Sequence, residues 1–245
     1  MIVILLFYFS NMSLPHFFVK DLPQGEESLV LGEENSRYIV QVLRMKDGEK
    51  IWLLNGKGMK ARAEILEAHK KHCTVSILEF YSEPRPATNI TIAISLLKNV
   101  SRFEWFLEKA TEIGVSKVVP LLCTRTETQK FRADRMQTII QSAMLQSQRL
   151  WLPELSDPVK FEKYLEEKFT GSKFIAHCIN EQERNSLAEI QAGDALILIG
   201  PEGDFTEQEI AFALQSNYGP VSLGAYRLRT ETAGLVAAAL LCRGI

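Results

Sequence analysis

The sequence predicts an α/β protein in two parts, a small β-rich module followed by a larger region with a parallel sheet. Short apolar runs separated by turn residues continue to about residue 83, and after this point strand and helix patterns alternate. Between the two patterns, Ser82–Pro86 contains two prolines, which disfavour both a helix and a central strand. We therefore expect a β-rich domain over residues 13–83, a linker over 84–88 and an α/β domain over 89–245.

The first residues of the chain form an apolar stretch, Met1–Phe9, that is too short to span a bilayer. It lacks the basic region and the small-residue cleavage site of a signal peptide. Met12 opens a sequence that itself reads as a protein start. We therefore interpret residues 1–12 as a start-site extension.

The β-rich module is predicted from three apolar runs, Lys50–Asn55, Lys60–Glu67 and Cys73–Tyr81. The Gly- and Lys-containing stretch Asn55–Gly58 is a strong turn signal between the first two runs. One helix, over about Glu33–Leu43, is expected to interrupt the strands.

The second part reads as alternating strands and helices, which favours a parallel sheet. Thr206 with Glu209 has the spacing of a capping box, and so does Ser101 with Glu104, before a helix that ends at Gly114. The expected strands are Asn89–Leu97, Lys117–Leu122, Lys173–Ala176, Ala195–Ile199 and Pro220–Leu223. The other expected helices are Ala133–Leu150, Phe161–Phe169 and Thr232–Cys242.

Two loops near the C-terminus, Ile199–Phe205 and Leu223–Ala233, are the strongest candidate for a functional site. Each follows a predicted strand and precedes a predicted helix, and open α/β sheets bind ligands at the carboxyl ends of their strands. Glycines there allow backbone N–H groups to approach a ligand closely. The second loop also crowds Arg227, Arg229 and Glu231 between two apolar segments, which a simple connection does not require.

The motifs in these loops, GPEG-x-F and LG-x-x-x-LRTETA, resemble the SPOUT superfamily of knotted methyltransferases. Within it, the chain is similar to the bacterial family that methylates N3 of a uridine in 16S ribosomal RNA. The resemblance covers nearly the whole chain, because four further blocks also match: Pro15–Val19, Val42–Arg44, Lys109–Val115 and Gln146–Arg149. One departure is Asp204, which stands where the family usually has a second glycine.

The resemblance implies a trefoil knot in the C-terminal domain, an N-terminal PUA-like β-barrel that binds RNA, and S-adenosylmethionine as cofactor. It also implies a homodimer that pairs through the small-residue helix after Thr232. The cofactor-binding residues that it implies are Ala176, His177, Ile199, Gly200, Pro201, Glu202, Gly203, Leu223, Gly224, Leu228, Thr230, Thr232 and Ala233.

The catalytic residues expected from the resemblance are Arg229 and Glu231. N3 of uracil carries a proton, so an anionic form of the base must be stabilised, and Arg229 is suited to the charge that develops on the uracil oxygens. Glu231 is expected to accept the proton or to hold Arg229. An acidic residue favoured by the dipole at a helix start explains Glu231 equally well.

The formal net charge of −2 is unevenly distributed along the chain. Residues 98–149 carry 9 basic and 5 acidic residues, and residues 44–62 carry 6 basic and 2 acidic ones. Basic patches can therefore contact RNA, although a solvated face explains any single lysine about as well. The RNA-binding candidates are Arg44, Lys46, Lys57, Lys60, Arg62, Lys98, Arg125 and Arg149.

The 4 cysteines and 4 histidines are scattered, with no spacing typical of a zinc site or a disulfide framework. We therefore expect no metal and no membrane association, and a reducing cytoplasm fits best. A nucleotide- or phosphate-binding enzyme is disfavoured because the chain lacks the P-loop and dinucleotide-binding glycine motifs. The remaining alternatives are an RNA-binding ribosome-assembly protein without S-adenosylmethionine, and a methyltransferase that acts on another RNA.

Overall fold

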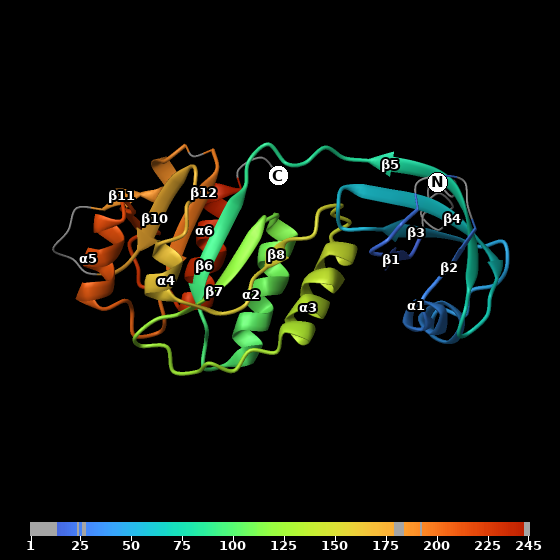
Figure 1. The fold of residues 1–245 in the computed structure, drawn as a ribbon, viewed down its shortest axis with the longest axis horizontal. Coiled ribbons are helices and arrows are strands. Elements are labelled where there is room, and N and C mark those ends of the chain that lie inside the picture. Colours follow the sequence, from blue (N-terminus) through green and yellow to red (C-terminus); the bar gives the residue numbers. More distant parts are fainter. Residues whose placement is uncertain (1–13, 24, 26–27, 179–183, 192, 243–245) are drawn as a thin grey trace, which may run out of the picture. The chain divides into compact units, whose positions relative to one another are not determined.

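The computed structural model describes residues 14–23, 25, 28–178, 184–191 and 193–242. The predicted extension over residues 1–12 lies outside them. The chain divides into two compact units, residues 1–85 and 86–245, at the end of the proline-containing stretch (Figure 1). Among the described residues, no helix is long and apolar enough to cross a membrane.

The N-terminal unit is built on a five-stranded sheet with the order β1-β3-β4-β5-β2. Strand β1 runs parallel to β3, and the other pairs are antiparallel. The strands are β1 His16–Phe18, β2 Ser28–Val30, β3 Lys50–Leu54, β4 Met59–Glu67 and β5 Thr74–Ser82. This arrangement confirms the predicted β-rich module.

One face of this sheet carries the core of the N-terminal unit. Side chains alternate along a strand, so Ile51 and Leu53 point into this core and are fully buried. The predicted helix over 33–43 is divided into an α-helix, α1 (Glu33–Arg37), and a π-helical segment, η1 (Tyr38–Val42). Ile39 of η1 is fully buried in the same core.

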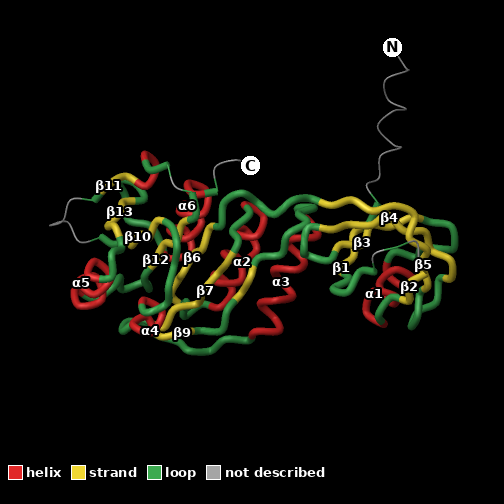
Figure 2. The backbone as a smooth tube through the Cα atoms, turned by 45° about the horizontal axis from the view of Figure 1, so that its top comes forward, coloured by secondary structure: helices red, strands yellow, loops and turns green. Residues whose placement is uncertain are grey.

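The C-terminal unit contains an eight-stranded sheet, whose strands are yellow in Figure 2. Every strand pair in this sheet is parallel. Its order is β11-β13-β10-β12-β6-β7-β8, with β9 also paired to β7. The strands are β6 Ile90–Ser95, β7 Lys117–Leu122, β8 Glu154–Leu155, β9 Val159–Lys160, β10 Ser172–Ala176, β11 Asn185–Ser186, β12 Ala195–Ile199 and β13 Gly219–Ser222. This sheet confirms the predicted α/β fold class, and the knot stays a prediction.

Helices cover both faces of the parallel sheet, which makes three layers (Figure 1). One face packs against α2 (Val100–Ile113), α3 (Ala133–Gln146) and α6 (Thr230–Leu241). The other face packs against α4 (Phe161–Leu165) and α5 (Glu207–Gln215). A short 3₁₀ segment, η2, spans Leu187–Glu189. Because the central strands are buried on both faces, they read as continuous apolar runs.

Two helix-start predictions have different outcomes. At α5, the capping box of Thr206 and Glu209 is confirmed. At α2, the predicted box of Ser101 and Glu104 is wrong, because Asn99 is the N-cap and its side chain accepts a hydrogen bond from the N–H of Ser101.

Two helices also end earlier than predicted. The end of α3 is set by Gln148, whose φ of 57° is left-handed, so the helix does not reach Leu150. Helix α4 ends at Leu165 rather than Phe169.

Candidate functional site

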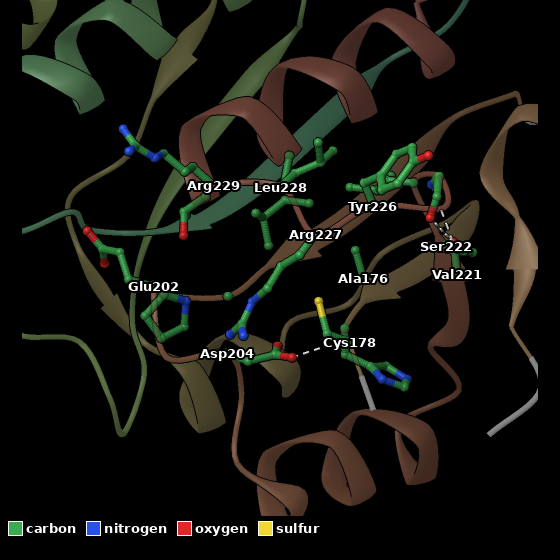
Figure 3. A pocket seen from close by; sticks show the side chains of 18 of the residues that line it. Ala176, Cys178, Glu202, Asp204, Val221, Ser222, Tyr226, Arg227, Leu228 and Arg229 are labelled. Carbon is green, nitrogen blue, oxygen red and sulfur yellow. Dashed lines mark hydrogen bonds between the residues drawn. The ribbon is translucent and has the colours of Figure 1, made fainter. Parts of the chain in front are cut away.

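A pocket with a volume of about 320 Å³ lies at the carboxyl ends of β10, β12 and β13 (Figure 3). Three neighbouring parallel strands end there, so their following loops converge on one cavity. The lining residues are Ala176, His177, Cys178, Arg184, Ile199, Gly200, Pro201, Glu202, Asp204, Val221, Ser222, Leu223, Gly224, Tyr226, Arg227, Leu228, Arg229, Thr230 and Ala233.

The loop after β12 follows a strand that is buried along its whole length. At Gly200 a Cβ would lie 3.1 Å from the ring of Phe205, so a side chain there would require this ring to shift by a few tenths of an ångström. The ring of Phe205 is itself buried against Phe161 on the far face of the sheet. Close packing between Gly200 and the buried ring of Phe205 thus constrains the path of this loop.

Asp204 is the departure from the family pattern, and its backbone has the left-handed φ of 63° that favours glycine. Aspartate tolerates this region better than most residues. Its Oδ2 accepts a hydrogen bond from the N–H of Cys178 at 2.8 Å, and its Oδ1 accepts one from the N–H of Phe205 at 2.8 Å. The carboxylate therefore ties the loop after β12 to the loop after β10.

A second set of hydrogen bonds holds this loop from the segment after β7. Arg125 donates hydrogen bonds to the carbonyl oxygens of Gly203 at 2.6 Å and Phe205 at 3.4 Å. The N–H of Thr124 donates to Oε1 of Glu209 at 2.8 Å, which joins the same segment to the start of α5. The pocket loop is thus held from two sides by side-chain hydrogen bonds.

Charged side chains of both signs line the pocket. Arg227 points toward Asp204 and Cys178, and Arg229 and Glu202 lie at the other end of the pocket (Figure 3). Burial lowers the pKa of His177, as does the neighbouring Arg184, so this imidazole is neutral at physiological pH. The arrangement offers cationic side chains to an electron-rich ligand and apolar walls beside them.

Comparisons with known proteins identify this architecture. A family model described as an RNA methyltransferase domain matches residues 83–242, and one described as an RNA methyltransferase PUA domain matches residues 31–78. The chain belongs to this RNA methyltransferase family. The resemblance predicted from the paired loop motifs is thereby confirmed.

Individual relatives agree with the family match. A curated relative from Synechocystis sp., named "Ribosomal RNA small subunit methyltransferase E", is 33% identical over 87% of this chain and 72% of the relative. A crystal structure of an enzyme of the same name from Neisseria gonorrhoeae, bound to S-adenosyl methionine, matches with a TM-score of 0.83 and 29% identity, covering 92% of this chain and 95% of that one. A related structure from Porphyromonas gingivalis matches with a TM-score of 0.84 and 37% identity, covering 92% and 95%.

In this RNA methyltransferase, the structure brings most of the predicted cofactor residues together. All of them line the pocket except Gly203 and Thr232, which lie outside the lining. A side chain at Gly203 would instead meet Cδ of Arg125 at 3.2 Å. The predicted catalytic residue Arg229 also lines the pocket.

The catalytic role of Glu231 stays a prediction, and the structure shows where its side chain lies. It is buried in the first turn of α6, outside the pocket lining, and its Oε1 lies 3.6 Å from Nε of Arg102 on α2. This ion pair links two helices and does not involve Arg229. The structure therefore supports the alternative, an acidic residue at a helix start.

Among the described residues, seven that line the pocket were not predicted as site residues: Cys178, Arg184, Asp204, Val221, Ser222, Tyr226 and Arg227. Asp204, Tyr226 and Arg227 lie inside the two predicted loops, so the motif spacing was sufficient to find them. Arg184 comes from a segment without a motif, and its guanidinium donates a hydrogen bond to the carbonyl oxygen of His177.

The predicted RNA-binding residues of this methyltransferase are spread over both units. In the N-terminal unit, Arg44, Lys46 and Lys57 are exposed, Lys60 lies beside aromatic rings, and Arg62 pairs with Glu79. In the C-terminal unit, Lys98 pairs with Glu127 at 2.7 Å.

Arg149 makes contacts that explain its presence without RNA. Its guanidinium donates hydrogen bonds to the carbonyl oxygens of Glu112 at 2.9 Å and Ile113 at 2.8 Å, at the C-terminus of α2. It also covers Gly114, whose φ of 102° ends this helix. The structure thus gives Arg149 a structural role at a helix end.

Proposed function

We propose that this chain transfers a methyl group from S-adenosylmethionine to N3 of a uridine in the 16S ribosomal RNA of the small subunit. The chain is an S-adenosylmethionine-dependent ribosomal RNA methyltransferase by family. The observation that carries the proposal is the pocket at the ends of β10, β12 and β13, in a chain whose relative from Neisseria gonorrhoeae was solved with the cofactor.

The pocket residues suit this cofactor. A volume of about 320 Å³ lies within the range of roughly 300–1,000 Å³ typical of small-molecule sites. Ala176, Ile199, Leu223 and Leu228 supply apolar walls for the adenine ring and the carbon chain. Gly200 and Gly224 line the pocket without a side chain, and the Glu202 carboxylate suits a cationic ligand.

When bound, S-adenosylmethionine supplies an electrophilic methyl carbon on a sulfonium. The uracil N3 lone pair forms the new N–C bond, the S–C bond breaks, and the N3 proton leaves to water. Arg229 is exposed at the pocket and stabilises the negative charge on the uracil oxygens. Arg227 lines the same cavity and adds to the positive potential that favours the anionic base.

We further propose that the enzyme is a homodimer that acts in the cytoplasm. Leu235 and Val236 on α6 are half-buried, Ala239 on the same helix is exposed, and Trp105 on α2 is 42% exposed. Apolar side chains on adjacent helices suit burial against a second copy. Sedimentation that shows a monomer at micromolar concentration would contradict the dimer.

The experiment for the proposed function is methylation of small subunits isolated from cells that lack the relevant modification. After reaction, the nucleosides of the 16S RNA are separated by chromatography and identified by mass spectrometry. The expected product is N3-methyluridine. The Arg229→Ala variant is expected to bind S-adenosylmethionine normally but to turn over about 10²–10³ times more slowly, the loss typical of removing a transition-state donor. A different methylated nucleoside would refute the assignment of N3, and normal turnover would refute the role of Arg229.

A further inference from the structure

The outer face of the N-terminal sheet carries a cluster of aromatic and basic side chains. His16 on β1 lies opposite Trp52 on β3, and Lys60 on β4 lies opposite Tyr81 on β5. Four adjacent strands thus contribute one side chain each to the same surface. We call His16, Trp52, Lys60 and Tyr81 the aromatic face.

This cluster is separate from the core of the unit. The residues next to it along the strands, Phe17, Ile51, Leu53 and Ala61, are buried and belong to the core. Since side chains alternate across a sheet, the aromatic face points away from that core. Tyr81 is 42% exposed although it is a large apolar residue.

The rings are close enough to form one surface. The centroids of His16 and Trp52 are 6.4 Å apart with nearly parallel planes, at 22°. Those of Trp52 and Tyr81 are 5.4 Å apart, edge to face. Nζ of Lys60 lies 4.7 Å from the Trp52 ring centroid and 5.5 Å from that of Tyr81, so a cation stands beside both rings.

The charge next to the rings is positive. Arg62 lies directly opposite Trp52 on the neighbouring strand and forms an ion pair with Glu79. Two cations, Lys60 and Arg62, therefore lie beside one anion, Glu79, which leaves one net positive charge. A hydrogen bond with Glu79 raises the pKa of the Tyr81 hydroxyl, so Tyr81 stays neutral. Burial lowers the pKa of His16, as does Lys60, and its ring is therefore neutral at physiological pH.

We propose that the aromatic face binds unpaired nucleotides of the RNA substrate, with bases stacked on the exposed rings and Lys60 on a phosphate. The inference rests on the proposed function, since it names how that RNA is held. Sheets that present exposed aromatic rings and cations bind single-stranded nucleic acids, because every base has a π-face that can stack. In a duplex these π-faces are covered by neighbouring bases, so the face selects unpaired RNA.

The charge favours RNA over a second copy of the chain as the occupant. A protein partner that covered the rings would also desolvate Lys60, which is costly without a carboxylate to match it. A phosphate backbone provides the opposite charge at every nucleotide. Dimerisation through this face is therefore an outcome that the test must exclude.

The test uses the full chain, a single-stranded oligouridine and an RNA duplex of the same length. Tyr81→Ser removes an exposed ring, and the matched control is Tyr38→Ser. Tyr38 is 50% exposed on η1, where its ring meets the core residue Phe17 on the other side of the sheet. Tyr81→Ser is expected to weaken oligouridine binding about 5- to 150-fold, the loss of roughly 1–3 kcal/mol for one stacked base, and to leave duplex binding unchanged.

Two more variants separate stacking from charge. Tyr81→Phe keeps the ring and is expected to bind like the native chain. Lys60→Gln is expected to lower the slope of log affinity against log salt by about 0.7, the value for one phosphate contact on a single strand. Tyr81→Ser should leave that slope unchanged, because the tyrosine ring carries no charge.

The proposal is overturned if Tyr81→Ser binds oligouridine as tightly as the native chain, or if Tyr38→Ser loses the same affinity. It is also overturned if Tyr81→Ser changes only the sedimentation of the protein, since that would identify the face as a contact between copies. The proposed function fails separately: a native chain that binds oligouridine through Tyr81 but methylates no 16S RNA would refute the function and retain the aromatic face.

Discussion

Arg125 donates a hydrogen bond of 2.6 Å to the carbonyl oxygen of Gly203, across 78 positions of sequence. The contact places a predicted RNA-binding cation against the backbone of the loop that forms the pocket. A residue in this position affects the cofactor through loop geometry, whereas a phosphate contact would affect RNA through charge. The two roles are therefore separable by experiment.

Replacing Arg125 with Gln is expected to weaken S-adenosylmethionine binding about tenfold, because a hydrogen bond from a charged donor is worth roughly 1.5–3 kcal/mol when fully formed and less when exposed. The salt dependence of RNA binding should not change. Calorimetry measures the first quantity and fluorescence anisotropy the second. Lys130→Gln, an exposed cation later in the same connection, is the control. Unchanged cofactor affinity with a lower salt slope would make Arg125 an RNA contact instead.

Arg149→Ala is expected to lower the free energy of unfolding by about 1–2 kcal/mol, because it removes the donors that satisfy the last carbonyl groups of α2. Denaturant unfolding measures this change, with Arg85→Ala in the exposed inter-unit stretch as the control. The salt slope of RNA binding should stay at the native value. A variant with native stability and weaker RNA binding would support the role predicted from charge alone.

Gly234→Val is expected to destabilise the C-terminal unit by about 1–3 kcal/mol through overpacking. A Cβ at Gly234 would lie 2.8 Å from both Ile94 and Phe106, where α6 meets β6 and α2. Gly193→Val is the control, because no atom lies within 4 Å of its added Cβ. Thermal unfolding compares the two variants, and equal unfolding temperatures would contradict this packing.

Cys178 provides a chemical probe of the pocket, since it is an exposed cysteine that lines it. Partial burial raises the pKa of its thiol, as does the neighbouring Asp204, so the reactive thiolate forms only at more alkaline pH than in a free cysteine. Alkylation should therefore be slow near neutral pH and accelerate as the pH rises through the raised pKa. S-adenosylmethionine is expected to protect Cys178 at every pH. If mass spectrometry shows equal labelling of Cys178 with and without the cofactor, the cofactor binds elsewhere.

The site was predictable from sequence where its determinants are local. The glycines of the two loops, the flanking apolar strands and the capping box at Thr206 all lie within a few residues of the pocket. The hydrogen bonds that hold the loop after β12 were not predictable, because Arg125 reaches Gly203 from a different strand connection. The ion pair of Glu231 was not predictable for the same reason, since its partner Arg102 lies on another helix.

The fold was likewise predictable only where its sequence signals are local and long enough. Long apolar runs such as Ala195–Ile199 identify buried strands directly, whereas β8, β9 and β11 have two residues each and carry no periodicity. At the start of α2, Asn99 and Ser101 are both good capping residues, so the sequence could not decide between them.

The most direct test of the central claim is a calorimetric titration of S-adenosylmethionine into three proteins. Ala176 lines the pocket, so Ala176→Phe should fill it, whereas Ala211→Phe adds the same ring on the exposed surface of α5. We expect the native chain and Ala211→Phe to bind the cofactor equally, and Ala176→Phe to show no binding while its thermal unfolding stays cooperative. Native affinity in Ala176→Phe would contradict the assignment of this pocket as the cofactor site.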